Sequence, residues 1–244
     1  MVGWQRQAAG VSVQGLLEDA LAELDGQSVT VTGAGRTDAG VHALGQAASV
    51  SLARTIDGPS LARALNAKLP LSVRVLDALS VAPSFHARFD ARSKTYHYRM
   101  WNGEVVPPFE RAYTWHVPGP LDVPSMAAAA AIFEGKHDFA AFQSTGTEPV
   151  TTTRRVLSAS VHVASRSGAS EGLARSAGVL VVFEVSGDGF LRHMVRSMAG
   201  TLVEVGRGRR PSGWVADVLR SRERSRAGPR APAEGLFLVR VEYA

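Results

Sequence analysis

Strand-like and helix-like segments follow one another along this chain without regular alternation, and this order constrains the fold more than any other feature. Leu17, Leu21 and Leu24 recur at helical spacing after Ser12, which can cap a helix over 12–24. A doubly wound parallel sheet requires strict strand–helix alternation, so we predict an α+β fold with a largely antiparallel sheet. Further helices are predicted at 60–68, 125–134, 191–205 and 211–219, and strands at 29–32, 46–52, 73–81, 95–101, 151–163, 178–186 and 236–243.

The composition excludes several classes of protein. The chain has 244 residues, of which 45% are hydrophobic, and no apolar run approaches the ~18–20 residues of a membrane span. The absence of cysteine excludes disulfides, thiolate nucleophiles and cysteine-based metal centres. The first residues contain no apolar stretch typical of a secretion signal. We therefore expect a soluble, cytoplasmic protein with no contact to a membrane.

The chain is also expected to divide into two domains, 1–84 and 85–244, with a hinge over 83–92 between them.

Arginine dominates the positive charge. The formal net charge is +5, and the only lysines are Lys68, Lys94 and Lys136, so 24 of the 27 basic residues are arginine. The planar guanidinium group binds phosphate oxygens in pairs and stacks on bases. This composition is compatible with a nucleic-acid partner, and equally with a GC-rich genome that favours arginine codons.

The densest motif is Gly33-Ala-Gly-Arg-Thr-Asp-Ala-Gly40, which directly follows a predicted strand. It does not match a dinucleotide-binding loop, because Asp38 stands where the third glycine should be and a strand follows instead of a helix. It does not match a P-loop either, because Val41 follows Gly40 where lysine is required. The motif therefore predicts a rigid turn that presents Arg36, Thr37 and Asp38 together, or an aspartate that simply bonds its own turn.

The histidines give no sign of a metal centre. His42, His86, His137 and His193 are scattered, and no H-E-x-x-H spacing is present. We interpret His42 and His86 as hydrogen-bonded parts of the scaffold. No metal and no cofactor is expected.

Several blocks of this sequence, in order, resemble the family of tRNA pseudouridine synthase A. The resemblance covers essentially the whole chain. The blocks are Gly3-Trp-Gln-Arg-Gln7, Val13-Gln-Gly15, the segment 33–46, Phe85-His-Ala-Arg-Phe89, Lys94-Thr-Tyr-His-Tyr98, the segment 189–200 and Ala231-Pro-Ala-Glu-Gly-Leu236.

The resemblance implies both a fold and a reaction. The fold would be two pseudo-symmetric ferredoxin/RRM-like halves whose mixed, largely antiparallel sheets join across a central RNA-binding cleft. The reaction would convert uridine to pseudouridine at positions 38–40 of the tRNA anticodon stem-loop. It involves no redox step and no group donor. The implied partners are tRNA and a second copy of the chain in a homodimer.

The resemblance also assigns roles to individual residues. Asp38 would be the catalytic nucleophile, although attack on the sugar, removal of a sugar proton and addition to the base stay open. Arg196 would pair with this carboxylate, because a buried charge requires a partner. Tyr96 would stack on the extruded uracil and could assist proton transfer. Strand alternation puts Tyr96 and Tyr98 on one face, so Tyr98 could serve as core packing instead.

Other residues would bind RNA. Arg36 would enter the stem and help extrude the target nucleotide, with Thr37 beside it. Arg192 is predicted to lie one helical turn before Arg196 and to contact phosphate. Arg88 would bind the RNA backbone. Further backbone contacts are expected at Gln5, Arg6, Arg92 and the basic segment 220–230.

Two further expectations accompany this interpretation: an alternative function, and a strand that is missing at the start of the chain. A non-catalytic tRNA-binding or RNA-folding protein of the same fold is the alternative, and intact Asp38, Tyr96 and Arg196 argue against it. Family members begin with a strand and a Tyr-Asp-Gly turn before the Gly-Trp-Gln block, whereas this chain begins at the block. We favour a start codon assigned too late over a lost strand, and expect the chain without that strand to be poorly stable.

Overall fold

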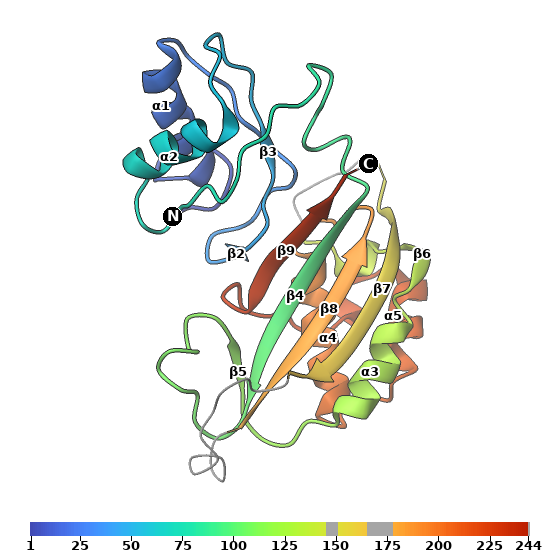
Figure 1. Cartoon of the computed structure of the whole chain (residues 1–244). Helices are drawn as coiled ribbons and strands as arrows, with labels where there is room; N and C mark the ends of the chain where they lie inside the picture. The colour runs from blue at the N-terminus through green and yellow to red at the C-terminus, as the bar shows by residue number, and fades with distance from the viewer. Residues whose placement is uncertain (145–150, 165–177, 244) are drawn as a thin grey trace. The chain divides into compact units, whose positions relative to one another are not determined.

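Figure 1 shows a computed structural model of the chain, which describes residues 1–144, 151–164 and 178–243. Contacts group these residues into two units. Unit 1 comprises residues 1–40, 45–91 and Tyr243, and unit 2 comprises residues 41–44 and 92–242. Each unit is described by itself below, and the predicted domains 1–84 and 85–244 stay a prediction.

Unit 1 is built around two helices. Helix α1 (Val13–Asp25) begins where the Ser12 hydroxyl accepts a hydrogen bond from the Gly15 N–H, as the sequence predicted. Helix α2 (Gly58–Lys68) is capped by Asp57 in the same way. Strand β1 (Thr32–Gly33) pairs antiparallel with β3 (Ala48–Ser49). The apolar core between these elements contains Trp4, Ala20, Leu21, Val31, Leu65 and Leu69.

The predicted strand over 73–81 is wrong, because this part of the described chain forms no strand. The Asn66 side chain accepts a hydrogen bond from the Val75 N–H and donates one to the Val75 carbonyl, so a side chain occupies the groups that a neighbouring strand would use. Val73 and Val75 pack on the core of unit 1, whereas Leu76 and Leu79 are exposed.

Unit 2 contains a seven-stranded mixed sheet, visible in Figure 1 as the large sheet of arrows. Six strands lie in the order β2-β9-β4-β8-β7-β6, and β5 pairs with β4. The β2–β9 and β4–β5 pairs are parallel and the other pairs are antiparallel, which confirms the predicted α+β class with its largely antiparallel sheet. The strands are β2 (His42–Ala43), β4 (Ser93–Asn102), β5 (Trp115–Val117), β6 (Gly135–Asp138), β7 (Thr153–Val163), β8 (Val179–Gly187) and β9 (Leu236–Glu242).

Helices α3 (Val123–Ala131), α4 (Met194–Gly206) and α5 (Trp214–Ser221) cover one face of this sheet (Figure 1). In the described residues, short 3-10 helices span Ala140–Phe142 and Arg224–Arg226. The predicted apolar stripe of the long helix is confirmed, because its members Met194, Met198 and Leu202 are fully buried. Most of the chain between β7 and β8 lies outside the described residues.

Candidate active site

The loop that carries Asp38 is held by the N-terminal segment of unit 1. Gly3 forms an isolated antiparallel bridge with Asp38, and the Trp4 N–H donates to the Thr37 carbonyl over 3.0 Å. Gly3 has a φ of +108°, and a Cβ there would lie 2.6 Å from the Thr37 oxygen. Only glycine fits this approach, so the backbone of residues 37 and 38 is fixed by residues 3 and 4.

The other end of the loop is also fixed. The Trp4 ring lies against Gly33, where an added Cβ would be 2.4 Å from the indole. The Ala34 N–H donates to the Ala47 carbonyl, and the Gln46 amide donates to the Gly35 carbonyl over 2.8 Å. The loop is therefore a rigid turn, as the glycine pattern predicted.

Three predicted site residues belong to this turn. Arg36 is exposed, whereas Thr37 and Asp38 are half-buried. That the turn presents these three side chains together stays a prediction. Arg88, also in unit 1, is exposed, and its guanidinium lies over the Phe89 ring at 5.7 Å.

Tyr96 lies in the middle of the unit 2 sheet. It is 7% exposed, and its ring meets Phe190 edge-on with centroids 5.1 Å apart. The pairing of β4 with β9 shifts register between Thr95 and Tyr96. Such irregularities change the direction in which a strand presents its side chains.

Tyr98 packs in the core, as the sequence analysis allowed. It is fully buried, and its hydroxyl donates to the Pro232 carbonyl over 2.8 Å. Burial raises the pKa of the Tyr98 phenol far above its ordinary value; Glu234 adds to the rise, whereas Arg196 opposes it. The phenol is therefore a neutral hydrogen-bond donor.

Arg196 occupies the first turn of α4 and is hydrogen-bonded to Ala231, in the segment that follows the 3-10 helix Arg224–Arg226. Its Nε donates to the Ala231 carbonyl over 2.8 Å, and the Ala231 N–H donates back to the Arg196 carbonyl. The planar guanidinium is thereby oriented by main-chain atoms.

Arg192 departs from the prediction. Helix α4 begins only at Met194, so Arg192 precedes the helix and does not lie one helical turn before Arg196. The physical reason is His193, which adopts a left-handed conformation with φ of 62° and interrupts the helical path. Arg192 is exposed, and its carbonyl accepts from the Ser144 N–H.

The site residues thus fall into two groups. Unit 1 carries Asp38 with Arg36, Thr37 and Arg88, and unit 2 carries Tyr96, Arg192 and Arg196. The proximity of Asp38 to Tyr96 and Arg196 stays a prediction.

The two histidines interpreted as scaffold have that role. The His42 ring stacks on Phe237 with centroids 4.7 Å apart, and its Nε2 lies 3.1 Å from the Ala112 carbonyl oxygen. The His86 Nδ1 accepts from the N–H groups of Arg88 and Phe89. Among the residues described, no three histidine, aspartate or glutamate side chains gather as metal ligands.

Sequence reasoning missed two polar side chains of α1, Gln14 and Glu18. They bond to each other and to residues on both sides of the Asp38 loop. The available signal was their spacing, because residues four apart lie on one side of a helix.

The chain is thus an α+β protein with an aspartate in a fixed turn, an exposed arginine two residues before it and a buried tyrosine in its large sheet. No helix in the described parts of the chain is both long and apolar enough to cross a bilayer. Comparison with known proteins makes the class specific. Residues 3–90 and 129–244 match the family model described as "tRNA pseudouridine synthase".

Similar full-length relatives carry the name "tRNA pseudouridine synthase A". The protein of Myxococcus xanthus is 47% identical over 242 residues, which cover 99% of this chain and 87% of the relative. The protein of Moorella thermoacetica is 45% identical over 243 residues, covering 99% and 94%. That of Solidesulfovibrio magneticus is 47% identical over 247 residues, covering 99% and 86%. The chain therefore belongs to the tRNA pseudouridine synthase family, a family of isomerases.

Proposed function

We propose that this chain isomerises uridine to pseudouridine at positions 38–40 of the tRNA anticodon stem-loop, with Asp38 as the nucleophile. The reaction breaks the N1–C1′ bond of uridine and forms a C5–C1′ bond, while N1 gains a proton and C5 loses one. Oxidation state and atom count are unchanged, so the enzyme must supply only positioning, charge and proton transfer.

The observation that carries this proposal is the rigid turn around Asp38. Residues 3 and 4 fix its backbone on one side, and Gly33 packs against the Trp4 ring on the other. A pre-positioned carboxylate loses little freedom when the reacting sugar approaches it.

The remaining residues have complementary roles in the proposal. Arg196, oriented by the Ala231 carbonyl, would neutralise the Asp38 carboxylate, and Tyr96 would stack on the extruded base. Arg36, in the same turn as Asp38, would enter the stem and help extrude the target nucleotide, with Thr37 beside it as a substrate-binding residue. Arg192 and Arg88, both exposed, would contact phosphates.

The larger architecture is part of the same proposal. The two halves would be pseudo-symmetric, ferredoxin/RRM-like and joined across an RNA-binding cleft, and the enzyme would act in the cytoplasm as a homodimer. The family resemblance supports these statements. Size-exclusion chromatography with light scattering tests the dimer, and a fully active monomer would contradict it.

The central experiment compares Asp38→Asn with the wild type. Transcribed tRNA is incubated with each protein, and pseudouridine is mapped by carbodiimide footprinting. Asp38→Asn should abolish turnover while tRNA affinity stays within about tenfold, because phosphate contacts dominate affinity. Asp77→Asn, which removes an exposed carboxylate of the same unit, is the matched control and should retain turnover.

The outcomes separate the alternatives. If the wild type binds tRNA and no pseudouridine forms, the chain is a non-catalytic RNA-binding or RNA-folding protein. If Asp38→Asn loses binding and turnover in parallel, Asp38 has a structural role.

A further inference from the structure

Two segments of the chain flank the Asp38 loop, and both bind to α1; they are called its borders here. Residues 3–6 form one border, because Gly3 and Trp4 bond to the loop directly. Val31 forms the other border; it directly precedes β1, whose last residue, Gly33, begins the loop. The Gly3 and Trp4 carbonyls also accept from the N–H groups of Val13 and Gln14, at the start of α1. Whatever fixes these borders to α1 therefore fixes Asp38.

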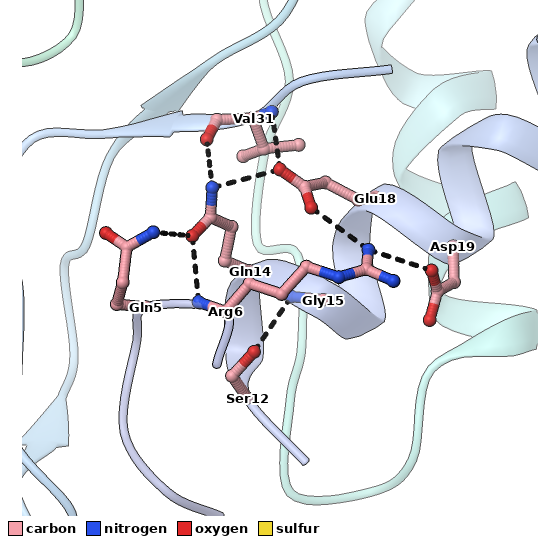
Figure 2. Close-up of polar contacts among 8 residues, drawn as sticks. All are labelled: Gln5, Arg6, Ser12, Gln14, Gly15, Glu18, Asp19 and Val31. Carbon is pink, nitrogen blue, oxygen red and sulfur yellow. Dashed lines mark hydrogen bonds and ion pairs between the residues drawn. The ribbon is translucent and has the colours of Figure 1, made fainter. Parts of the chain in front are cut away.

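Gln14 bonds to both borders at once (Figure 2). Its Oε1 accepts from the Gln5 side chain over 2.7 Å and from the Arg6 N–H over 3.0 Å. Its Nε2 donates to the Val31 carbonyl over 3.1 Å and to Glu18 over 2.9 Å. All four bonds use both ends of one amide, so the donor and the acceptor are both required.

Glu18 completes the same link from the next helical turn (Figure 2). Its Oε1 accepts from the Val31 N–H over 3.1 Å as well as from Gln14. Its Oε2 accepts from the Arg6 guanidinium over 3.1 Å, and that guanidinium also contacts Asp19. The Glu18 carboxylate thus binds the main chain of Val31 in the second border and the side chain of Arg6 in the first border.

We propose that Gln14 and Glu18 are positioning residues for Asp38. They fix residues 3–6 and Val31 to α1, and thereby set the register of the bridge between Gly3 and Asp38. This inference rests on the proposed role of Asp38. The two side chains do not touch the substrate; they act through the backbone of the loop.

The chemistry of the link identifies a discriminating substitution. Gln14→Glu keeps the volume and the acceptor toward Gln5 and Arg6. It loses both N–H donors and places a second carboxylate beside Glu18. The Val31 carbonyl then loses its donor and the two carboxylates repel each other, so this border of the loop loosens. A small displacement of a reacting group can reduce turnover on the order of 10- to 100-fold.

A double variant tests whether the bonding pattern itself matters. In Gln14→Glu/Glu18→Gln the donor moves to residue 18. The amide oxygen at residue 18 can still accept from the Val31 N–H, as Glu18 Oε1 does, and no second carboxylate faces the one at residue 14. The repulsion disappears and the net charge of the pair is restored. We expect this variant to recover part of the kcat lost by Gln14→Glu.

Gln27→Glu is the matched control. Gln27 donates to Asp25 beyond the C-terminal end of α1, so its substitution also places a second carboxylate beside an existing one. Its hydrogen bond to Asp25 is not among the bonds that link residues 5, 6, 14, 18 and 31 (Figure 2). A general loss of stability would affect both variants, whereas a loss of loop position would affect only the first.

The measurements are kcat and KM for tRNA, well below the melting temperature of each variant. We expect Gln14→Glu to lower kcat about tenfold or more with KM within about twofold, and Gln27→Glu to leave both unchanged. Equal kcat values in the two variants, or a change confined to KM, would overturn the proposal. If Gln14→Glu does not fold, Glu18→Gln replaces it, with Glu23→Gln as its control, because each removes a carboxylate of α1 that binds a cation.

Asp38→Asn, measured in the same series, separates the positioning role of Gln14 and Glu18 from the proposed role of Asp38 as nucleophile. If Asp38→Asn is inactive and Gln14→Glu has normal kcat, the positioning role is wrong and the nucleophile stands. If Asp38→Asn turns over normally, the nucleophile is wrong and the positioning role falls with it.

Discussion

At the residue scale, several segments of this protein are held by single polar side chains that bond to the main chain. Asp25 accepts from the N–H groups of Ala53 and Arg54 over 3.0 and 2.8 Å, and Tyr98 donates to the Pro232 carbonyl. Each bond joins segments that lie far apart in the sequence. Such bonds contribute modestly when formed, but leaving a buried partner unsatisfied is costly.

Asp25 should make the stability of unit 1 depend on acid pH. The backbone N–H groups of Ala53 and Arg54, followed by the Gln27 amide, lower the pKa of Asp25 below its ordinary value of 3.8. Because the folded-state pKa is lower than the unfolded-state one, the stabilisation is complete above about pH 4 and is lost as pH falls through the folded-state pKa. We expect the difference in melting temperature between wild type and Asp25→Asn to shrink from about pH 6 to about pH 2. Thermal unfolding followed by circular dichroism measures this, and a constant difference would contradict the assignment.

Removing the Tyr98 hydroxyl should destabilise unit 2 without altering its packing. Tyr98→Phe leaves the Pro232 carbonyl without this donor, and should lower the free energy of unfolding by about 1 kcal/mol. Urea denaturation measures the change. Tyr113→Phe, at a side chain that is 45% exposed, is the control and should have little effect.

At the element scale, helix α4 packs closely against the segment 228–231. A Cβ on Gly200 would lie 1.7 Å from the Pro229 oxygen, and the Gly228 N–H donates to the Thr201 hydroxyl. This approach keeps Ala231 within reach of Arg196. The glycine in the middle of α4 is therefore required by its neighbour in space, although it lowers helix propensity.

Gly200→Ala should consequently be destabilising by about 1–3 kcal/mol, because backbone atoms must move to admit the methyl group. Gly213→Ala, where an added Cβ would have no atom within 4 Å, is the control. Chemical denaturation of both variants gives the comparison. If the two alanine variants have equal stability, the close approach at Pro229 does not constrain α4.

The same scale shows which elements the sequence could predict. Helix α1 and strands β4, β7 and β8 carry long periodic patterns, and the structure confirms them. Strands β2, β5 and β6 have two to four residues and exist because a partner strand passes beside them, which no local pattern reveals.

The candidate site also has a part that the sequence could predict and a part that it could not. The turn around Asp38 was predictable from its glycines, since these dictate backbone conformation locally. The roles of Gln14 and Glu18 were not, because they depend on residues 5, 6 and 31 being brought to α1 by the fold. The failure at 73–81 has the same cause, a side-chain contact from Asn66.

At the scale of the whole molecule, the excess of positive charge is the property that matters for tRNA. The chain carries +5 with arginine as its main cation. Some arginines pair with acidic neighbours, as Arg209 does with Glu204 and Arg222 with Asp138. Phosphate binding releases counterions from the RNA, so the affinity of such a protein should depend strongly on salt.

The salt dependence should therefore separate binding from catalysis. If three or four phosphates are contacted, tRNA affinity should fall on the order of 10- to 100-fold between about 50 and about 200 mM salt. Asp38→Asn should share this slope, because its carboxylate binds no phosphate. Arg36→Ala should reduce the slope of log affinity against log salt by about one unit if Arg36 contacts a phosphate. Arg63→Ala removes the same charge from an exposed position in α2, where the guanidinium bonds to Ser60, and is the control. Equal slopes for Arg36→Ala and Arg63→Ala would mean that Arg36 contributes only net charge, whereas a lower slope for Arg36→Ala alone assigns it a phosphate beside the proposed nucleophile.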